Sequence, residues 1–325
     1  MTETHPQPFT DAYLPGPQST KFYTRTYQPP SSSPPSAVVV FVHGFIDHVA
    51  RYTDFHAALA RSGLVVFAYD QRGFGRTALD EKGKERRDTG NRGYAKTSWR
   101  EQLEDVEWMV KHAREQFGAL PLFLMGHSMG GGLCIAFNTR TSAPPSASTV
   151  SLLSGVIACS PLLRQTTPAS SVLKWVGGKA SKVMPYMTIP AEVKAEQLSH
   201  NPAVVEAAKA DSFVKYVGCL KGVSDMLEGG ALLVTRDYKN WPVNLPLLIF
   251  HGTADEVTDP KASQEFIERV PAKDKTINLY PGAYHEPWHE TVPEGVSDQM
   301  VREAAEWIKA RSAEGEGSRE DRAKL

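Results

Sequence analysis

The chain has 325 residues, of which 36 are lysine or arginine, 37 are aspartate or glutamate and 41% are hydrophobic. This composition excludes disorder as the main state, and a net charge of −1 gives no reason to expect nucleic acid, which requires a basic face. The length allows two domains or one large α/β domain with an insertion.

Three cysteines, Cys134, Cys159 and Cys219, are too few and too scattered for a disulfide framework. The N-terminal residues have neither the basic nor the apolar region of a signal peptide. No run approaches the roughly 18 apolar residues that a membrane-spanning helix needs. We therefore expect a cytoplasmic protein, free or peripheral on a membrane.

The first half of the chain alternates short apolar segments with helix-length segments. Strands are predicted at 20–28, 37–42, 64–69, 121–125 and 152–159. All but the first are apolar on both faces, which is typical of a buried parallel sheet. A helix is predicted over 98–117, because apolar residues recur every three or four positions and Ser98 with Glu101 forms a capping box.

The strand rhythm stops after residue 160 and resumes with 246–250 and 276–280, before a last helix near residue 297. We therefore expect an α/β chain in which helices flank a mostly parallel central sheet and a helical cap is inserted. The expected parts are a core at 1–160, a cap at 161–241, the rest of the core at 242–311 and a disordered tail at 312–325.

The segment Gly126-His-Ser128-Met-Gly130 stands between a predicted strand and a predicted helix. A GxSxG string alone is a weak signal, but in this position it predicts the sharp turn that exposes a nucleophilic serine. The two glycines leave room for the strained backbone. Ser128 is therefore the candidate nucleophile.

A serine nucleophile needs a histidine base and a carboxylate that orients the histidine. In chain order the carboxylate and then the histidine should follow the serine at strand ends, which selects Asp255 and His285. Glu256 and Asp259 are rival carboxylates. Asp259 precedes a proline and is better interpreted as a helix N-cap.

His285 and His289 also spell the zinc-binding string HExxH. That string binds zinc only when both imidazoles lie on one face of an unbroken helix, and Pro287 would break the helix. We therefore expect no metal and no cofactor, and we expect His289 to lie at the rim of the site, where it starts or caps a helix.

Two backbone amides must stabilise the oxyanion that forms during acyl transfer. One comes from the residue after the nucleophile, Met129, and the other from the loop after the strand at 37–42, where Phe45 is the natural donor. We interpret His43 and His127 as structural residues that hold these loops.

Asp70 and Arg72, at the end of the strand at 64–69, are predicted to form a buried ion pair with a structural role.

Five motifs together resemble the monoacylglycerol lipase family of α/β-hydrolases, in a fungal form. They are HGFIDHVARY at 43–52, YDQRGFGRT at 69–77, GHSMGGG at 126–132, HGTADEVTDP at 251–260 and YPGAYHE at 280–286. The resemblance implies an α/β-hydrolase fold and the triad Ser128, Asp255 and His285. It also places the oxyanion amides on Phe45 and Met129.

The resemblance further implies that Asp47 and Arg51 receive the glycerol end of a lipid ester. Relatives commonly carry a glutamate in place of Asp47. Where many of them place a second histidine, this chain has Trp288, which makes Trp288 a candidate substrate-binding residue. The cap departs from some relatives at Ala208, where they place a tyrosine.

The predicted cap mixes apolar and lysine residues. They are Val172, Leu173, Trp175, Val176, Val183, Met184, Tyr186, Met187 and Ile189, with Lys174, Lys179 and Lys182. This mixture suits a lid that touches a membrane or lipid droplet, and it equally suits side chains that pack the cap onto the core. Cys219 in the cap is interpreted as an inert buried thiol, although a pocket position would make the enzyme thiol-sensitive.

The leading hypothesis is hydrolysis of monoacylglycerol to glycerol and a fatty acid through an acyl-enzyme. A lysophospholipase, a thioesterase or a general carboxylesterase would use the same triad. A non-catalytic lipid-binding relative is a further alternative, although no triad member is missing.

Overall fold

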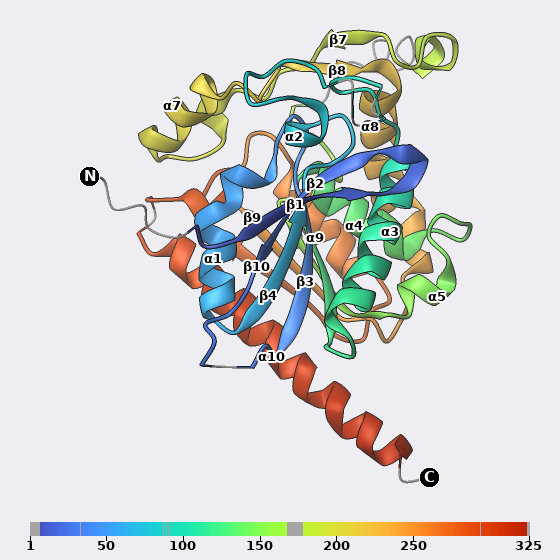
Figure 1. Ribbon diagram of the computed structural model, residues 1–325, viewed down its shortest axis with the longest axis vertical. Helices are drawn as coiled ribbons and strands as arrows, with labels where there is room; N and C mark the ends of the chain where they lie inside the picture. The colour runs from blue at the N-terminus through green and yellow to red at the C-terminus, as the bar shows by residue number, and fades with distance from the viewer. Residues whose placement is uncertain are drawn as a thin grey trace.

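An eight-stranded sheet forms the centre of the protein in a computed structural model (Figure 1), which describes residues 7–323 except 33, 87, 89, 91, 168–177 and 293. In spatial order the strands are β1 (Thr10–Pro15), β2 (Lys21–Tyr27), β4 (Leu64–Tyr69), β3 (Ala37–Val42), β5 (Leu122–His127), β6 (Leu153–Cys159), β9 (Leu247–Gly252) and β10 (Lys275–Tyr280). The strands from β4 to β10 pair in parallel, whereas β1 and β2 are antiparallel. The expected mostly parallel sheet is confirmed.

Both faces of the sheet are covered by helices, which explains why β3 is apolar throughout. Val38, Val40 and Val42 face one hydrophobic core, and the alternate residues face the other. The first core is completed by α3 (Trp99–Phe117), α4 (Met129–Thr139), α8 (Leu220–Thr235) and α9 (Pro260–Arg269). The second is completed by α1 (Thr53–Arg61) and α10 (Val296–Ala323).

Local sequence signals set several helix boundaries as expected. The Ser98 hydroxyl accepts the backbone N–H of Glu101 at the start of α3, and Gly118, with φ 66°, ends that helix. Asp259 caps α9 by accepting the N–H of Lys261, which confirms its structural interpretation. Two further helices are short: α2 (Gly75–Ala78) and α5 (Ala147–Val150).

The chain leaves the large sheet after β6 and returns at β9. This insertion contains β7 (Thr188–Pro190), α7 (Pro202–Ala210), β8 (Val217–Cys219) and α8. The antiparallel pair of β7 with β8 was not expected, because three-residue strands carry too few residues to show alternation. Figure 1 shows α7, β7 and β8 at one end of the sheet, while the C-terminal end of α10 extends from the opposite end.

Two expectations, about the C-terminal residues and about a buried ion pair, are corrected, and one edge strand was not predicted. Edge strand β1 was missed, because five of its six side chains are exposed and it lacks an apolar face. The helix α10 continues to Ala323, so residues 312–323 are helical and not the expected disordered tail; their Ala, Arg and Glu residues favour helix. Asp70 and Arg72 do not pair with each other.

Arg72 instead forms a buried ion pair with Asp105 of α3, with N···O distances of 2.5 and 2.9 Å. Arg72 also donates to the Thr20 hydroxyl at 2.7 Å. Asp70 accepts the backbone N–H groups of Val49 and Arg76 at 2.7 and 2.6 Å. Arg72 therefore joins α3 to the start of β2, and Asp70 holds the loop after β3.

Replacing Arg72 with methionine should lower the free energy of unfolding by about 3–5 kcal/mol, because the buried Asp105 carboxylate loses its partner. The measurement is urea denaturation of both proteins. The control is Arg236→Met, which removes an exposed pair with Asp237 and should cost at most about 1 kcal/mol. Equal losses in the two variants would contradict the prediction.

Candidate active site

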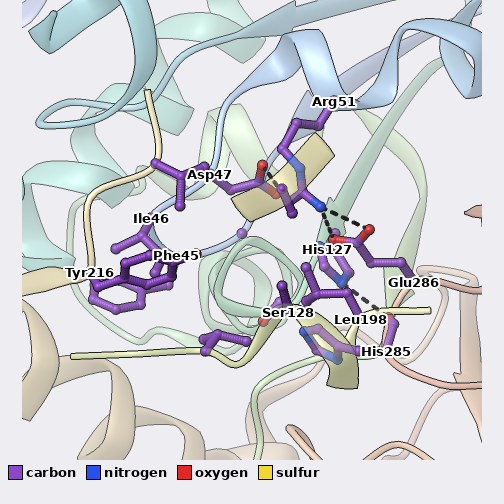
Figure 2. A pocket seen from close by; sticks show the side chains of 15 residues that line it. Phe45, Ile46, Asp47, Arg51, His127, Ser128, Leu198, Tyr216, His285 and Glu286 are labelled. Carbon is purple, nitrogen blue, oxygen red and sulfur yellow. Dashed lines mark hydrogen bonds and ion pairs between the residues drawn. The ribbon is translucent and has the colours of Figure 1, made fainter. Parts of the chain in front are cut away.

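Ser128 occupies a strained turn between β5 and α4. Its φ of 53° and ψ of −118° lie where few residues other than glycine are found. Two glycines make the turn possible, since a Cβ on Gly126 would collide with the carbonyl of Gly130, and one on Gly130 with the carbonyl of Val42. The turn holds the Ser128 side chain at the wall of a pocket (Figure 2).

The other two predicted triad residues meet at the same end of the sheet. His285 Nδ1 lies 2.8 Å from Asp255 Oδ2, and both side chains are buried. Asp255 follows β9 and His285 follows β10, which are parallel neighbours, so their carboxyl ends carry the two loops side by side. His285 lines the pocket with Ser128 (Figure 2). The structure therefore brings the three residues together.

The Asp255 carboxylate is surrounded by hydrogen-bond donors. Its Oδ1 accepts the backbone N–H groups of Val257 and Thr258 at 2.8 and 2.9 Å. Its Oδ2 accepts the Thr258 hydroxyl at 2.8 Å and lies 3.2 Å from His251 Nε2. Burial disfavours the charge, but His285 and His251 outweigh it and hold the pKa of Asp255 well below its usual value. Asp255 is thus ionised and fixed.

His251 and Thr258 were given no role from the sequence. His251 is fully buried, with Nδ1 2.8 Å from the Ser263 hydroxyl and Nε2 3.1 Å from the Thr258 carbonyl oxygen. Because Nε2 faces a carbonyl and a carboxylate, it must carry the proton. The one signal in the sequence was that His251 stands four residues before Asp255 at the same strand end.

The candidate oxyanion amides belong to Met129, which follows Ser128 in the chain, and to Phe45, which lines the same pocket. Met129 is the first residue of α4, so its N–H has no carbonyl partner within the helix. Phe45 lies in the turn after β3, and its N–H donates to no group in the part of the chain that the structure describes. Both amides are therefore available to an oxygen bound beside Ser128.

His43 and His127 hold the surrounding loops by hydrogen bonds. His43 Nε2 accepts the N–H of Gln71 at 2.8 Å. His127 Nδ1 lies 2.8 Å from the Tyr52 hydroxyl. Burial and the neighbouring His285 lower the pKa of His127 to about 3, so this imidazole is neutral at physiological pH. Neither ring takes the place of His285 beside Asp255.

The pocket beside Ser128 contains about 470 Å³ of space, part of which is open to solvent. In Figure 2, the apolar Phe45, Ile46 and Tyr216 lie on one side of it, and the polar Arg51, His127 and Glu286 lie on the other. Its apolar wall comes mostly from the insertion and contains Val193, Ala195, Leu198, Ala208, Val214 and Tyr216, joined by Phe45 and Ile46 from the core. Its polar residues include Asp47, Arg51, His127 and Glu286. A pocket with one apolar side and a few convergent polar groups suits an amphiphilic ligand.

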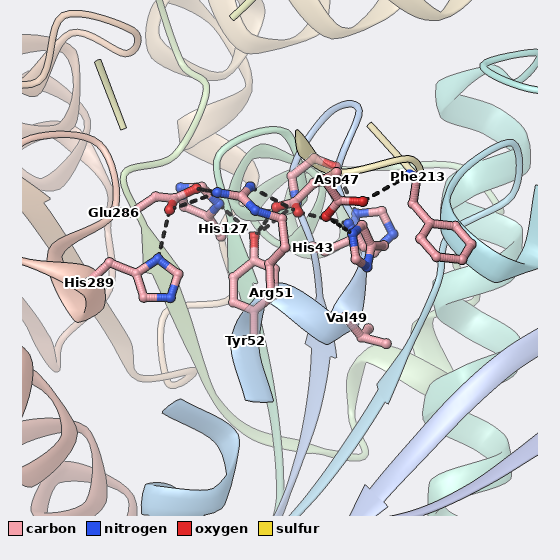
Figure 3. A network of polar contacts seen from close by, with 12 residues as sticks. His43, Asp47, Val49, Arg51, Tyr52, His127, Phe213, Glu286 and His289 are labelled. Atoms are coloured by element: carbon pink, nitrogen blue, oxygen red, sulfur yellow. Dashed lines mark hydrogen bonds and ion pairs between the residues drawn. The ribbon is translucent and has the colours of Figure 1, made fainter. Parts of the chain in front are cut away.

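At the polar end, Arg51 lies between two buried carboxylates (Figure 3). It donates to Asp47 Oδ1 at 3.1 Å and to both oxygens of Glu286 at 2.8 and 3.0 Å. Burial opposes ionisation of both acids, but Arg51 outweighs it, lowering the pKa of Glu286 to about 2 and that of Asp47 below its usual range. Tyr52 also donates to Asp47.

The structure corrects the expectation for Trp288. Its side chain is buried and stacks on Tyr52, with ring centroids 5.2 Å apart, and it does not line the pocket. The indole packs against Tyr52 and His127, whereas Glu286, two residues earlier, lines the pocket. Glu286 belonged to a quoted motif but was not predicted as a site residue, because its partner Arg51 is 235 residues away in the chain.

The zinc interpretation has no structural support. Pro287–His289 form a single turn of 3₁₀ helix, and Glu286 is bound to Arg51 and to His289. Within the described residues there is no cluster of three or more potential metal ligands. His289 is the last residue of this short turn. The expectation that it starts a longer helix is wrong.

Cys219 does not line the pocket. Its thiol is buried, donates to the carbonyl of Thr97 and accepts the N–H of Gly222, both at 3.2 Å. It caps α8 and matches the interpretation as a structural cysteine.

Several known proteins are similar to this chain in sequence and in fold. A family model described as serine aminopeptidase, S33 matches residues 33–292. A putative monoglyceride lipase of Schizosaccharomyces pombe is 36% identical over 276 residues, which cover 84% of this chain and 68% of that protein. The monoacylglycerol lipase of Mycolicibacterium smegmatis is 31% identical, with 82% of this chain and 87% of that protein covered.

The chain belongs to the monoacylglycerol lipase family. Solved structures agree on the fold. A soluble variant of the Saccharomyces cerevisiae monoglyceride lipase in complex with a substrate analogue gives a TM-score of 0.79 at 24% identity, covering 96% of this chain and 97% of that one. The expected α/β-hydrolase fold is confirmed. Among the described helices, none is long and apolar enough to cross a membrane.

The contacts of His251 predict a change in pH dependence. Replacing His251 with alanine leaves Asp255 with one donor fewer, so more of its negative charge acts on His285 and favours the protonated imidazole. A protonated His285 cannot act as a base, so the acid limb of kcat/KM should move to higher pH by about one unit, the equivalent of ~1.4 kcal/mol.

The measurement is a pH profile of ester hydrolysis for the wild type, His251→Ala and His251→Gln. Glutamine retains an N–H donor at this position and should restore the wild-type profile. A uniform loss of rate in both variants, with no shift along the pH axis, would show that His251 only supports packing.

Proposed function

We propose that this protein is a serine hydrolase that cleaves monoacylglycerol into glycerol and a free fatty acid. The observation that carries the proposal is the hydrogen-bonded pair of His285 and Asp255 beside Ser128, at the wall of a pocket with an apolar and a polar end. The names of the relatives support the choice of substrate.

The proposed reaction uses the three residues as follows. The Ser128 hydroxyl attacks the ester carbonyl while His285 Nε2 takes its proton, and Asp255 stabilises the imidazolium. The amides of Phe45 and Met129 bind the oxyanion. The intermediate collapses by breaking the bond to glycerol, whose oxygen receives the proton from His285. Water, activated by His285, then attacks the acyl-enzyme and releases the fatty acid and Ser128.

A fluorophosphonate probe and a monoacylglycerol assay together test this proposal. The wild type should be labelled and should release glycerol, whereas Ser128→Ala should lose labelling and at least about 10³-fold of kcat. Labelling of Ser128→Ala equal to the wild type would refute Ser128 as the nucleophile. Tight binding of monoacylglycerol by the wild type without turnover would favour the non-catalytic alternative.

We also propose that the enzyme is cytoplasmic and that it contacts its lipid substrate through the insertion. The side chains of Val183, Met184 and Met187 are 81%, 53% and 42% exposed. Lys179 and Lys182 precede them in sequence, and lysines suit contact with lipid headgroups. Tyr186 and Ile189 of the predicted surface are partly buried, and Val172, Leu173, Lys174, Trp175 and Val176 lie outside the described residues.

Membrane contact is tested by co-sedimentation with anionic vesicles. The double variant Val183→Ser and Met184→Ser should bind at least about tenfold more weakly, since each buried apolar side chain contributes ~1.5–3 kcal/mol. The matched control is Val243→Ser, 44% exposed in the loop before β9, which should bind like the wild type. Undiminished binding by the double variant would exclude this surface as the contact.

A further inference from the structure

The charge balance at the polar end of the pocket is set by Glu286. Among the described lining residues, Arg51 is the single side chain with a permanent positive charge, and Asp47 and Glu286 carry two negative charges. The side chains of these acids are 4% and 1% exposed, so water screens them little. The neutral His127 adds no charge.

The histidine outside the pocket does not reverse this balance. His289 Nδ1 lies 2.8 Å from Glu286 Oε2 and does not line the pocket. With His289 neutral, the group of Asp47, Arg51, Glu286 and His289 carries one net negative charge. With His289 protonated, the group is neutral. Arg51 therefore never acts as an uncompensated cation.

Hydrogen bonding points in the same direction. Two nitrogens of Arg51 already donate to carboxylates. Within the described residues, Asp47 Oδ2 and Glu286 Oε1 each accept one hydrogen bond, so each has a lone pair left for a donor from a ligand. A hydroxyl can donate to a carboxylate and accept from a remaining N–H of Arg51. A phosphate monoanion or dianion offers mainly acceptors and brings like charge next to two buried carboxylates, which is unfavourable.

Glu286 is held firmly in this position. Its backbone N–H donates to the carbonyl of Leu198 in the insertion at 2.8 Å, and its carboxylate makes a bidentate contact with Arg51. It directly follows His285, so a headgroup that reaches Arg51 also meets Glu286 (Figures 2 and 3).

We propose that Glu286 is a specificity-determining residue that makes this pocket reject anionic headgroups and accept neutral, hydroxyl-bearing ones. The inference rests on the proposed ester hydrolysis and deepens it, because it separates a monoacylglycerol from a lysophosphatidate with the same acyl chain. Without the second carboxylate, Arg51 would be paired only with Asp47 and the group would lose its excess negative charge.

The experiment compares kcat/KM for 1-oleoylglycerol, 1-oleoyl lysophosphatidate and the dimethyl phosphate ester of that lysophosphatidate, all in the same neutral detergent micelles. The wild type should prefer 1-oleoylglycerol to the lysophosphatidate by about 100-fold, and Glu286→Gln should narrow that ratio about tenfold. Glutamine is similar in shape and retains an oxygen that can accept from Arg51. The matched control Glu256→Gln removes the same charge from an exposed position outside the pocket and should leave the ratio unchanged.

The dimethyl ester keeps the phosphate group but has no charge on it. The wild-type protein alone can therefore separate the effect of charge from that of size. The wild type should hydrolyse it at least about tenfold faster than the lysophosphatidate, because repulsion is gone. Equal rejection of the two phosphates would mean that size excludes them and would overturn the proposal. So would a wild type that accepts the lysophosphatidate, or the same ratio in Glu286→Gln and the wild type.

These outcomes are distinct from failure of the proposed function. A protein that hydrolyses p-nitrophenyl butyrate but none of the three lipids is not a lipase, and this result would overturn the function together with the inference. Hydrolysis of 1-oleoylglycerol and lysophosphatidate at similar rates would overturn only the inference.

Discussion

The buried carboxylate of Asp255 is the constraint around which the candidate active site is organised. A charge at this depth is tolerated only with donors on both oxygens, and the chain supplies them from three places: the turn after β9, His251 within β9 and His285 after β10. The same turn reaches β6, where the Thr258 hydroxyl lies 3.0 Å from the Ser160 carbonyl oxygen. The hydrogen bonds around the Asp255 carboxylate thus link the C-terminal ends of β6, β9 and β10.

The parallel sheet makes this arrangement possible. Because β3, β5, β9 and β10 run in one direction, their carboxyl ends bring the candidate oxyanion turn, Ser128, Asp255 and His285 to a single edge of the sheet. Close packing then sets the fine geometry: a side chain at Gly130 would strike the backbone of β3. The position of the Ser128 turn therefore depends mainly on close contacts between backbone atoms.

Sequence reasoning succeeded where the cause is local. The turn at Ser128 is encoded by adjacent glycines, and Asp259 could be separated from Asp255 because a proline follows it. It failed where tertiary packing chooses the partner of a charge. Arg72 pairs with Asp105, 33 residues away, and Arg51 with Glu286, 235 residues away. No spacing rule selects such pairs, and the same applies to the inward packing of Trp288.

The apolar wall and the polar residues of the pocket come from separate parts of the chain. Most of its apolar wall comes from the insertion, whereas Ser128, Asp255, His285 and the polar end belong to the α/β core. Changes in the insertion can therefore reshape the apolar side of the pocket, while the three candidate catalytic residues stay in the core. The apolar and the polar side of the pocket can thus be altered separately, by substitutions in the insertion or in the core.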